Sequence, residues 1–131
     1  MRFMVIVKAN KDSEAGVLPD KKILTEMGKF NEQLTKAGVM LAGEGLQASS
    51  KGARVKFDEG KRTVTDGPFA ETKELIGGYA ILNAKSKEEA IELTRRFLSL
   101  MGEGECEIRL MQDVPGFEAE HSQPAEMAAK Q

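Results

Sequence analysis

Two amphipathic helical stripes, each set between strand-like runs, limit this chain to a small set of folds. Apolar residues recur at spacings of three and four in both stripes, which is typical of a helix with one buried face. The first stripe predicts a helix over residues 19–37, with Pro19 in its first turn and Gly38 at its end. The second begins at a capping box formed by Ser86 and Glu89. The stripes consist of Ile23, Met27, Phe30, Leu34 and Ala37, and of Ala90, Leu93, Phe97 and Met101.

Strand-like runs surround both stripes and complete the architecture. Apolar runs predict strands at residues 2–9, 39–47, 75–83 and 105–113, with a polar loop at 10–18. A turn at residues 58–60 predicts an inserted β-hairpin over 53–57 and 61–65. Without this hairpin the order is β-α-β-β-α-β, so the sequence predicts an α+β, ferredoxin-like fold. Its antiparallel sheet carries both helices on one face.

The first strand is apolar on both of its faces, which indicates that both faces are covered. The helices cover only one face, and the other exposes apolar side chains in a monomer. An exposed apolar face of this size is typical of an interface. The sequence therefore predicts a homodimer in which two sheets pack face to face. The side chains expected on or near this face are Met4, Ile6, Met40, Ala42 and Met111.

The length of 131 residues fits one domain, predicted at residues 1–117. Residues 118–131 are poor in large apolar side chains, so we expect a mobile or weakly helical tail that can dock on a partner subunit. The net charge of −2, without a basic stripe, argues against nucleic-acid binding. No apolar run suits a membrane span or an export signal. A lone cysteine, Cys106, is consistent with a cytoplasmic protein.

Charged side chains gather on a constrained loop at residues 65–74, TDGPFAETKE. Gly67 and Pro68 force a sharp turn, because proline fixes φ and glycine tolerates unusual conformations. Asp66 at this turn is the candidate catalytic residue, as a general base. The alternative is that Asp66 only bonds its own loop backbone. Glu71 and Lys73 are candidate ligand-binding residues, or a solvated charge pair of little energetic weight.

Three further candidates lie on the strands. Glu44 sits between two glycines, and we expect its carboxylate on the open face of the sheet, where burial raises the pKa unless a cation is near. Arg109 is its expected partner, so the two side chains would line a cleft against the partner subunit. An interface salt bridge without a ligand is the alternative. Tyr79, the single tyrosine, would hydrogen-bond a ligand in this cleft or pack in the core.

Other kinds of chemistry find little support in the sequence. No His/Cys cluster or acidic ligand spacing indicates a metal, and Gly43-Glu44-Gly45 lacks the rest of a dinucleotide motif. We therefore predict no metal and no cofactor. Cys106 has no neighbouring histidine or second cysteine, so we expect a small buried side chain instead of a nucleophile.

Several segments together resemble the DGPF, or YCII-related, family of proteins. The strongest is VTDGPFAETKE at residues 64–74, followed by GGY at 77–79, and the others are the start MRFMVI, AGVMLAGEGL at 37–46 and EIR at 107–109. The resemblance spans residues 1 to about 114. It implies a dimeric α+β barrel built from two ferredoxin-like units. Many members of this branch are uncharacterised, and some lie beside genes for alternative sigma factors.

The wider superfamily implied by this resemblance includes a dehydrochlorinase thought to use a His-Asp pair. This chain departs from that pattern, because its one histidine, His121, lies in the tail. The leading hypothesis is a small polar organic molecule bound in a cleft at the dimer interface. A cofactor-independent lyase or isomerase step with a carboxylate base would then be the reaction. Two alternatives stay open, a non-catalytic binding or regulatory module linked to transcription, and a structural dimer.

Overall fold

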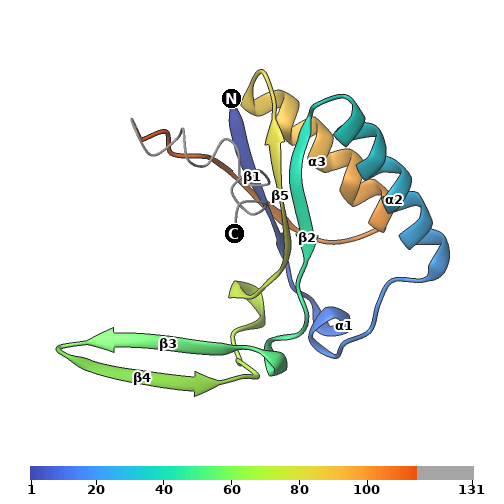
Figure 1. Cartoon of the computed structure of the whole chain (residues 1–131). Helices are drawn as coiled ribbons and strands as arrows, with labels where there is room; N and C mark the ends of the chain where they lie inside the picture. The colour runs from blue at the N-terminus through green and yellow to red at the C-terminus, as the bar shows by residue number, and fades with distance from the viewer. Residues whose placement is uncertain (115–131) are drawn as a thin grey trace, which may run out of the picture.

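The computed structural model describes residues 1–114, apart from the side chain of Thr72, and shows a sheet with helices on one side (Figure 1). The main sheet has the order β2-β5-β1-β6, and all its neighbouring strands are antiparallel. This order confirms the predicted ferredoxin-like α+β fold. The strands are β1 (Arg2–Lys8), β2 (Met40–Gly45), β5 (Ile76–Asn83) and β6 (Cys106–Leu110), and the long helices are α2 (Lys21–Lys36) and α3 (Lys87–Met101).

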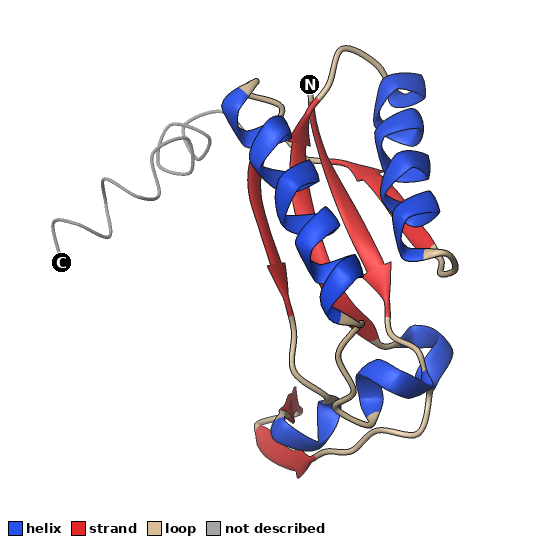
Figure 2. Ribbon diagram, turned by 90° about the vertical axis from the view of Figure 1, so that its right-hand side faces the viewer, coloured by secondary structure: helices blue, strands red, loops and turns tan. Residues whose placement is uncertain are grey.

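The core lies between the sheet and the two long helices, which run side by side over one sheet face (Figure 2). Phe3 of β1 lies opposite Leu82 of β5, and both side chains are buried. Phe3 clusters with Ala84 and with Ala90 of α3, which has no exposed surface. Each helix thus turns its apolar stripe toward the sheet, as its spacing predicts, and the buried part of the stripes consists of Phe30, Leu34 and Ala90.

The region before α2 differs from the prediction. The expected polar loop at 10–18 contains a one-turn helix, α1 (Lys11–Glu14). The helix α2 begins at Lys21 instead of 19, because the Asp20 carboxylate accepts a hydrogen bond from the backbone N–H of Ile23 at 2.8 Å. Asp20 is therefore the N-cap, and Pro19 lies outside the helix.

The open face of the sheet carries Met4, Ile6 and Ala42, as predicted. Met40 was wrongly expected near this face. A register shift between Met40 and Ala42 places Met40 opposite Leu82, on the side of the helices. A bulge of this kind moves one side chain to the other face of a strand, which alternation alone does not reveal.

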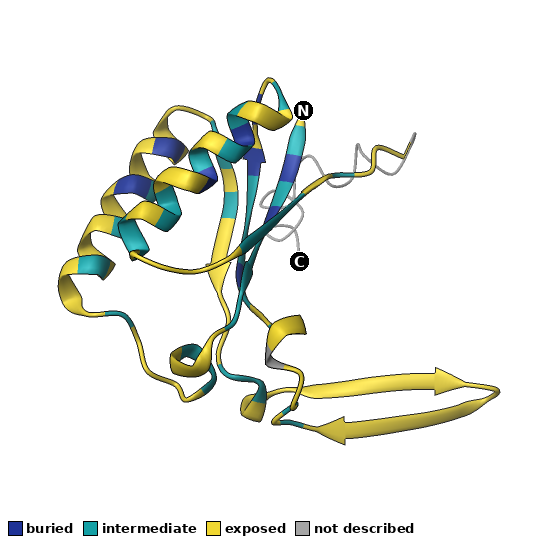
Figure 3. Ribbon diagram, turned by 180° about the vertical axis from the view of Figure 1, so that it is seen from behind, coloured by how far each residue is buried: buried dark blue, intermediate teal, exposed yellow. Residues whose placement is uncertain are grey.

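The inserted hairpin, β3 (Ala53–Asp58) and β4 (Lys61–Asp66), forms a separate two-stranded sheet. It projects from one end of the main sheet, away from the helices and past the open face (Figures 1 and 3). All of its residues are exposed. Two short 3₁₀ turns, η1 (Ser49–Lys51) and η2 (Thr72–Glu74), flank it.

The predicted tail, residues 118–131, lies outside the described residues. Among the described helices, none is both long enough and apolar enough to span a bilayer.

Candidate functional site

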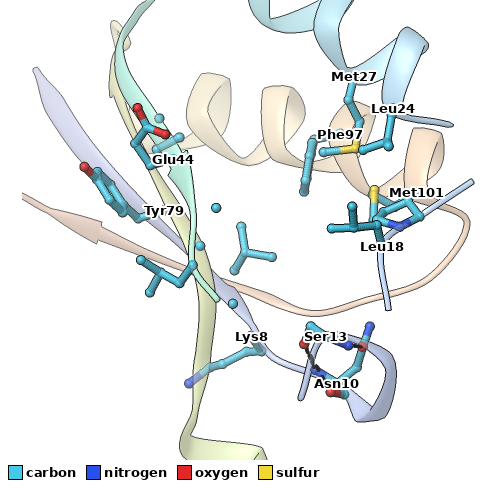
Figure 4. Close-up of a pocket in the computed structure, with 18 of the residues that line it drawn as sticks. Lys8, Asn10, Ser13, Leu18, Leu24, Met27, Glu44, Tyr79, Phe97 and Met101 are labelled. Atoms are coloured by element: carbon cyan, nitrogen blue, oxygen red, sulfur yellow. Dashed lines mark hydrogen bonds between the residues drawn. The ribbon is translucent and has the colours of Figure 1, made fainter. Parts of the chain in front are cut away.

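A hollow of about 1210 Å³ lies between the sheet and the helices, at the end where α1 is found (Figure 4). Strands β1, β2 and β5 form one wall, α2 and α3 form the opposite wall, and α1 closes one end. Most of the helix side chains around it are apolar, and they include Met27, Phe30, Leu34, Phe97 and Met101. Concave sites of this size with apolar walls and a few polar groups are typical of small-molecule binding.

Glycines leave part of the sheet wall free of side chains. Gly43, Gly45 and Gly78 all line the hollow, on the face that alternation turns toward the helices. A Cβ at Gly45 would have no atom within 4 Å, so open space lies beside it. A Cβ at Gly78 would come within 2.9 Å of the carbonyl oxygen of Glu44, so here glycine permits the close approach of β2 and β5. The empty volume thus follows from where glycines stand in two paired strands.

Apolar side chains at the edge of the hollow are open to solvent. Leu18, in the loop between α1 and α2, lines the hollow and has 75% of its surface exposed (Figure 4). Val17, Leu24 and Leu46 also line the hollow and are exposed. Exposed apolar side chains that share one concave surface mark an interaction site more often than scattered ones do. The hollow is therefore accessible from outside.

The α1 end supplies the polar groups. Asn10 and Ser13 form a capping box, in which the Asn10 side chain accepts from the Ser13 N–H at 2.8 Å and Ser13 Oγ accepts from the Asn10 N–H at 2.9 Å. Glu14 accepts two hydrogen bonds from Ser49, one from its N–H at 2.9 Å and one from its Oγ at 2.5 Å. These bonds, the side-chain one first, lower the pKa of Glu14 below the ordinary carboxyl value. Glu14 therefore ties α1 to η1.

The 65–74 segment also contacts Ser49, and it supports the connection between α1 and η1. The N–H of Phe69 donates to Ser49 Oγ at 3.1 Å, so Ser49 bridges Glu14 and the segment. A Cβ at Gly67 would lie 1.7 Å from the Ser49 carbonyl oxygen, a contact that only glycine avoids. Arg54 of β3 stacks on the Phe69 ring at 3.9 Å and forms an ion pair with Glu71 at 3.4 Å. Among the described residues, the segment thus fixes the base of the hairpin and, through Ser49, the position of α1 at the end of the hollow.

We expect Glu14→Gln to flatten the acid dependence of stability. The folded-state pKa of Glu14 is depressed, so its stabilising contribution is present above the ordinary carboxyl pKa of about 4.3 and is lost as pH falls through the folded-state pKa. Urea unfolding of the wild type and variant, at neutral pH and at successively lower pH, measures this. The free energies of unfolding of the two proteins should become more similar as pH falls. A constant difference at every pH would contradict the role of this ionised carboxylate.

The candidates predicted on the 65–74 segment lie near the hairpin base and are not among the residues that line the hollow. Asp66 ends β4 and is exposed, and no hydrogen bond or ion pair within the described chain reaches its carboxylate. Glu71 is half-exposed and paired with Arg54. Lys73 is exposed in η2. The expected Glu71–Lys73 pair is therefore replaced by a Glu71–Arg54 pair.

Glu44 and Tyr79 are cross-strand neighbours on β2 and β5. Their side chains point away from the hollow, to the other side of the sheet (Figure 4). The predicted pairing of Glu44 with Arg109 does not form within one chain. Because β5 and β1 separate β2 from β6, the two residues are three strand spacings apart, roughly 14 Å.

Arg109 pairs with Glu107 instead, at 3.2 Å, and Lys8 lies 3.6 Å from the same carboxylate. The hydrogen bond from Arg109, followed by the charge of Lys8, lowers the pKa of Glu107. One edge of the open face therefore has two cations around one carboxylate, and the other edge has Glu44. These charges would be complementary if two sheets packed with opposite edges together.

Four residues that position the site were missed from the sequence: Glu14, Ser49, Arg54 and Phe69. Only the Asn10-to-Ser13 spacing, which resembles a capping box, could have indicated α1 in advance. Cys106 is half-buried, and burial raises the pKa of its thiol, as suits a packing residue. No group of three or more potential metal ligands occurs among the described residues.

Comparison with known proteins identifies a family. The model of the YCII-related domain matches residues 1–113. An uncharacterised protein of Rhizobium meliloti (strain 1021) is 28% identical over 76 residues, which is 58% of this chain and 61% of that protein. The chain thus spans about three-fifths of the length of this curated relative.

Two solved structures are similar at low sequence identity. One is 5-chloro-2-hydroxyhydroquinone dehydrochlorinase from Burkholderia phenoliruptrix AC1100 in complex with 2,5-dihydroxybenzoquinone, with a TM-score of 0.45, 13% identity, and coverage of 87% of this chain and 96% of that chain. The other is a divalent cation tolerance protein from Thermus thermophilus, with a TM-score of 0.36, 11% identity and 93% coverage of both chains.

Proposed function

We propose that this chain, which belongs to the YCII-related domain family, binds a small polar organic molecule in the hollow between its sheet and helices. The observation that carries the proposal is a solvent-accessible hollow of about 1210 Å³, whose sheet wall has glycines among its apolar side chains. Where the glycines stand, a flat molecule can approach the backbone closely.

The lining indicates the chemistry of the ligand. Aromatic and thioether side chains, among them Phe97, Met27 and Met101, suit an aromatic or apolar body. Polar groups stand at the α1 end and along the edge, and they include Asp12, Gln47, Ser50 and Lys51. A small hydroxylated aromatic or carboxylic acid satisfies both requirements.

The proposal also includes a catalytic step. In it, Asp66 is the carboxylate base of a lyase or isomerase step that needs no cofactor. Because Asp66 lies at the hairpin base and does not line the hollow, this step belongs to a separate site there, with Glu71 and Lys73 as its proposed ligand-binding residues. Glu44, Tyr79 and Arg109 are the ligand-binding residues proposed for the open face of the sheet.

A non-catalytic binding module is the second candidate, and the lining of the hollow favours it. Two of the carboxylates that line it are engaged in structure, since Glu14 is held by Ser49 and Asp20 caps α2, whereas Asp12 and Glu103 also line it. A carboxylate with a lowered pKa is a weak base, so Glu14 is poorly suited to take a proton. Binding without turnover, as in a regulatory protein, would need no base here.

The proposal includes a homodimer formed by the open sheet faces. Met4, Ile6, Ala42 and Ile81 form an apolar centre on this face in the described chain. Glu44 on one edge, and Lys8 with Arg109 on the other, are complementary between two copies. This arrangement brings Glu44 near the opposite edge of a second sheet, which a single chain does not do.

A thermal-shift screen of small carboxylic acids and hydroxylated aromatics tests the function. A true ligand should raise Tm in proportion to the logarithm of its concentration, because it binds the folded state only. Repeating the screen with Asp66→Asn separates the candidates. Binding that survives while turnover disappears supports a catalytic Asp66. Binding without turnover in either protein supports the second candidate, and no binding by any compound of these classes argues against the function.

A further inference from the structure

The hairpin arm, residues 53–66, has one mainly apolar face that the described residues leave uncovered. Because side chains alternate and Val55 lies opposite Val64, the side chains of Ala53, Val55, Phe57 and Val64 share a face, which also carries Arg62 near the tip and Asp66 at the base. Val55, Phe57 and Val64 are 72%, 70% and 65% exposed. The other face carries Arg54, Lys56, Lys61 and three more polar residues.

An isolated two-stranded hairpin is marginally stable, and an exposed apolar β face is prone to aggregation. The arm is nevertheless fixed in direction at its base. Gly67 donates to the Gly52 carbonyl at 2.9 Å, Gly67 packs directly on Ser49, and Arg54 binds both Phe69 and Glu71. A rigidly held arm with an apolar face suits docking on another surface.

The direction of the arm identifies that surface. Figures 1 and 3 show the arm passing to the side of the main sheet that is opposite the helices, which is the side of the open face. Any molecule packed on the open face would therefore lie beside the arm. The arm and the open face therefore border the same space.

We infer that the apolar face of the arm docks against a second copy of this chain, packed on the open face. The inference rests on the homodimer of the proposed function and adds a second contact to it. Each strand of the arm has six residues and is about 20 Å long, whereas packed sheets lie about 10 Å apart. The arm thus reaches past the partner's sheet to its far layer, and two-fold symmetry gives each copy one arm around the other.

The test compares a variant of the apolar face with a matched variant of the polar face. Replacing Val55, Phe57 and Val64 with Thr keeps residues that suit a strand but removes the apolar contact. Lys56→Thr with Lys61→Thr alters the opposite face. Sedimentation equilibrium of the full-length proteins should give a dimer Kd at least about tenfold higher for the triple variant, as for the loss of one strong interface contact, and little change for the control.

The outcomes separate this inference from the dimer itself. A wild type that stays monomeric at high concentration overturns the dimer and the arm contact together. A dimeric wild type whose Kd is unchanged in the triple variant overturns only the arm contact.

A photo-crosslinking residue at position 57 gives a second measurement that does not depend on the stability of the variants. Cross-linked dimers, with peptides of one chain joined to the arm of the other, support the inference. Cross-links confined to a single chain show that the arm folds back on its own copy, and they overturn it.

Discussion

Gly45→Leu is expected to weaken ligand binding by at least about tenfold while the chain remains folded. A Cβ at Gly45 meets no atom within 4 Å, so leucine fits the strand and its side chain enters the hollow. It then occupies space that the ligand would need, and competition for buried space readily costs more than the 1.4 kcal/mol that corresponds to about tenfold. Concentration-dependent thermal shift with a hit from the screen measures the change.

Gly28→Leu is the matched control. Gly28 stands on α2, is exposed, and does not line the hollow, and a Cβ there also meets no atom within 4 Å. The same substitution at this position should leave binding unchanged. Equal affinity of the wild type and Gly45→Leu would show that the ligand occupies another place.

Phe3→Ala is expected to cause the largest loss of stability, about 3–5 kcal/mol in the free energy of unfolding. Phe3 is 2% exposed and packs with Ala84, Ala90 and Ile108 at the contact between the sheet and α3. Ala84 and Ala90 are small and cannot fill the cavity left by a phenyl ring. Since a domain of this size has roughly 5–15 kcal/mol of stability, a large fraction of the total is removed.

Urea unfolding at protein concentrations where both proteins are monomeric measures the effect. Phe57→Ala is the control, because Phe57 lies on the hairpin arm and is 70% exposed. Its loss should change monomer stability by less than about 0.5 kcal/mol, as for surface substitutions generally. Comparable losses for the two variants would contradict the position of the core.

Periodicity was enough to predict the main sheet and the two long helices, because their apolar spacing records which face is buried. Periodicity did not predict the short local features. α1 has only four residues and no buried side chain, so no apolar pattern marks it. The start of α2 depends on one hydrogen bond from the Ile23 N–H to Asp20, which outweighed the preference of Pro19 for a first helical turn.

The pairing of Glu44 with Arg109 failed for a different reason. Alternation places both side chains on the open face, and that part agrees with the register. It does not say which strands lie between them, and the order β2-β5-β1-β6 puts them on opposite edges. Distance across a sheet depends on topology, which a single strand's pattern does not contain.

The hollow could not be predicted, because it results only in part from missing side chains. Glycines inside strands are typical of a bulge or a close approach, and Gly78 marks a close approach of β2 and β5. That Gly45 instead leaves space depends on how far α2 and the α1 loop stand from β2, which is a tertiary property. The 65–74 segment was predicted to carry chemistry, whereas the contacts of its Phe69 and Gly67 are structural, with Ser49.

The most direct test of the account is to locate a bound hit by NMR, using the backbone amides of the full-length protein. We expect the largest chemical-shift changes at Gly43, Gly45 and Gly78, with smaller changes near α1 and the end of α3. Changes concentrated instead at Asp66 and Glu71, or on the open face around Glu44 and Arg109, would contradict the hollow as the binding site.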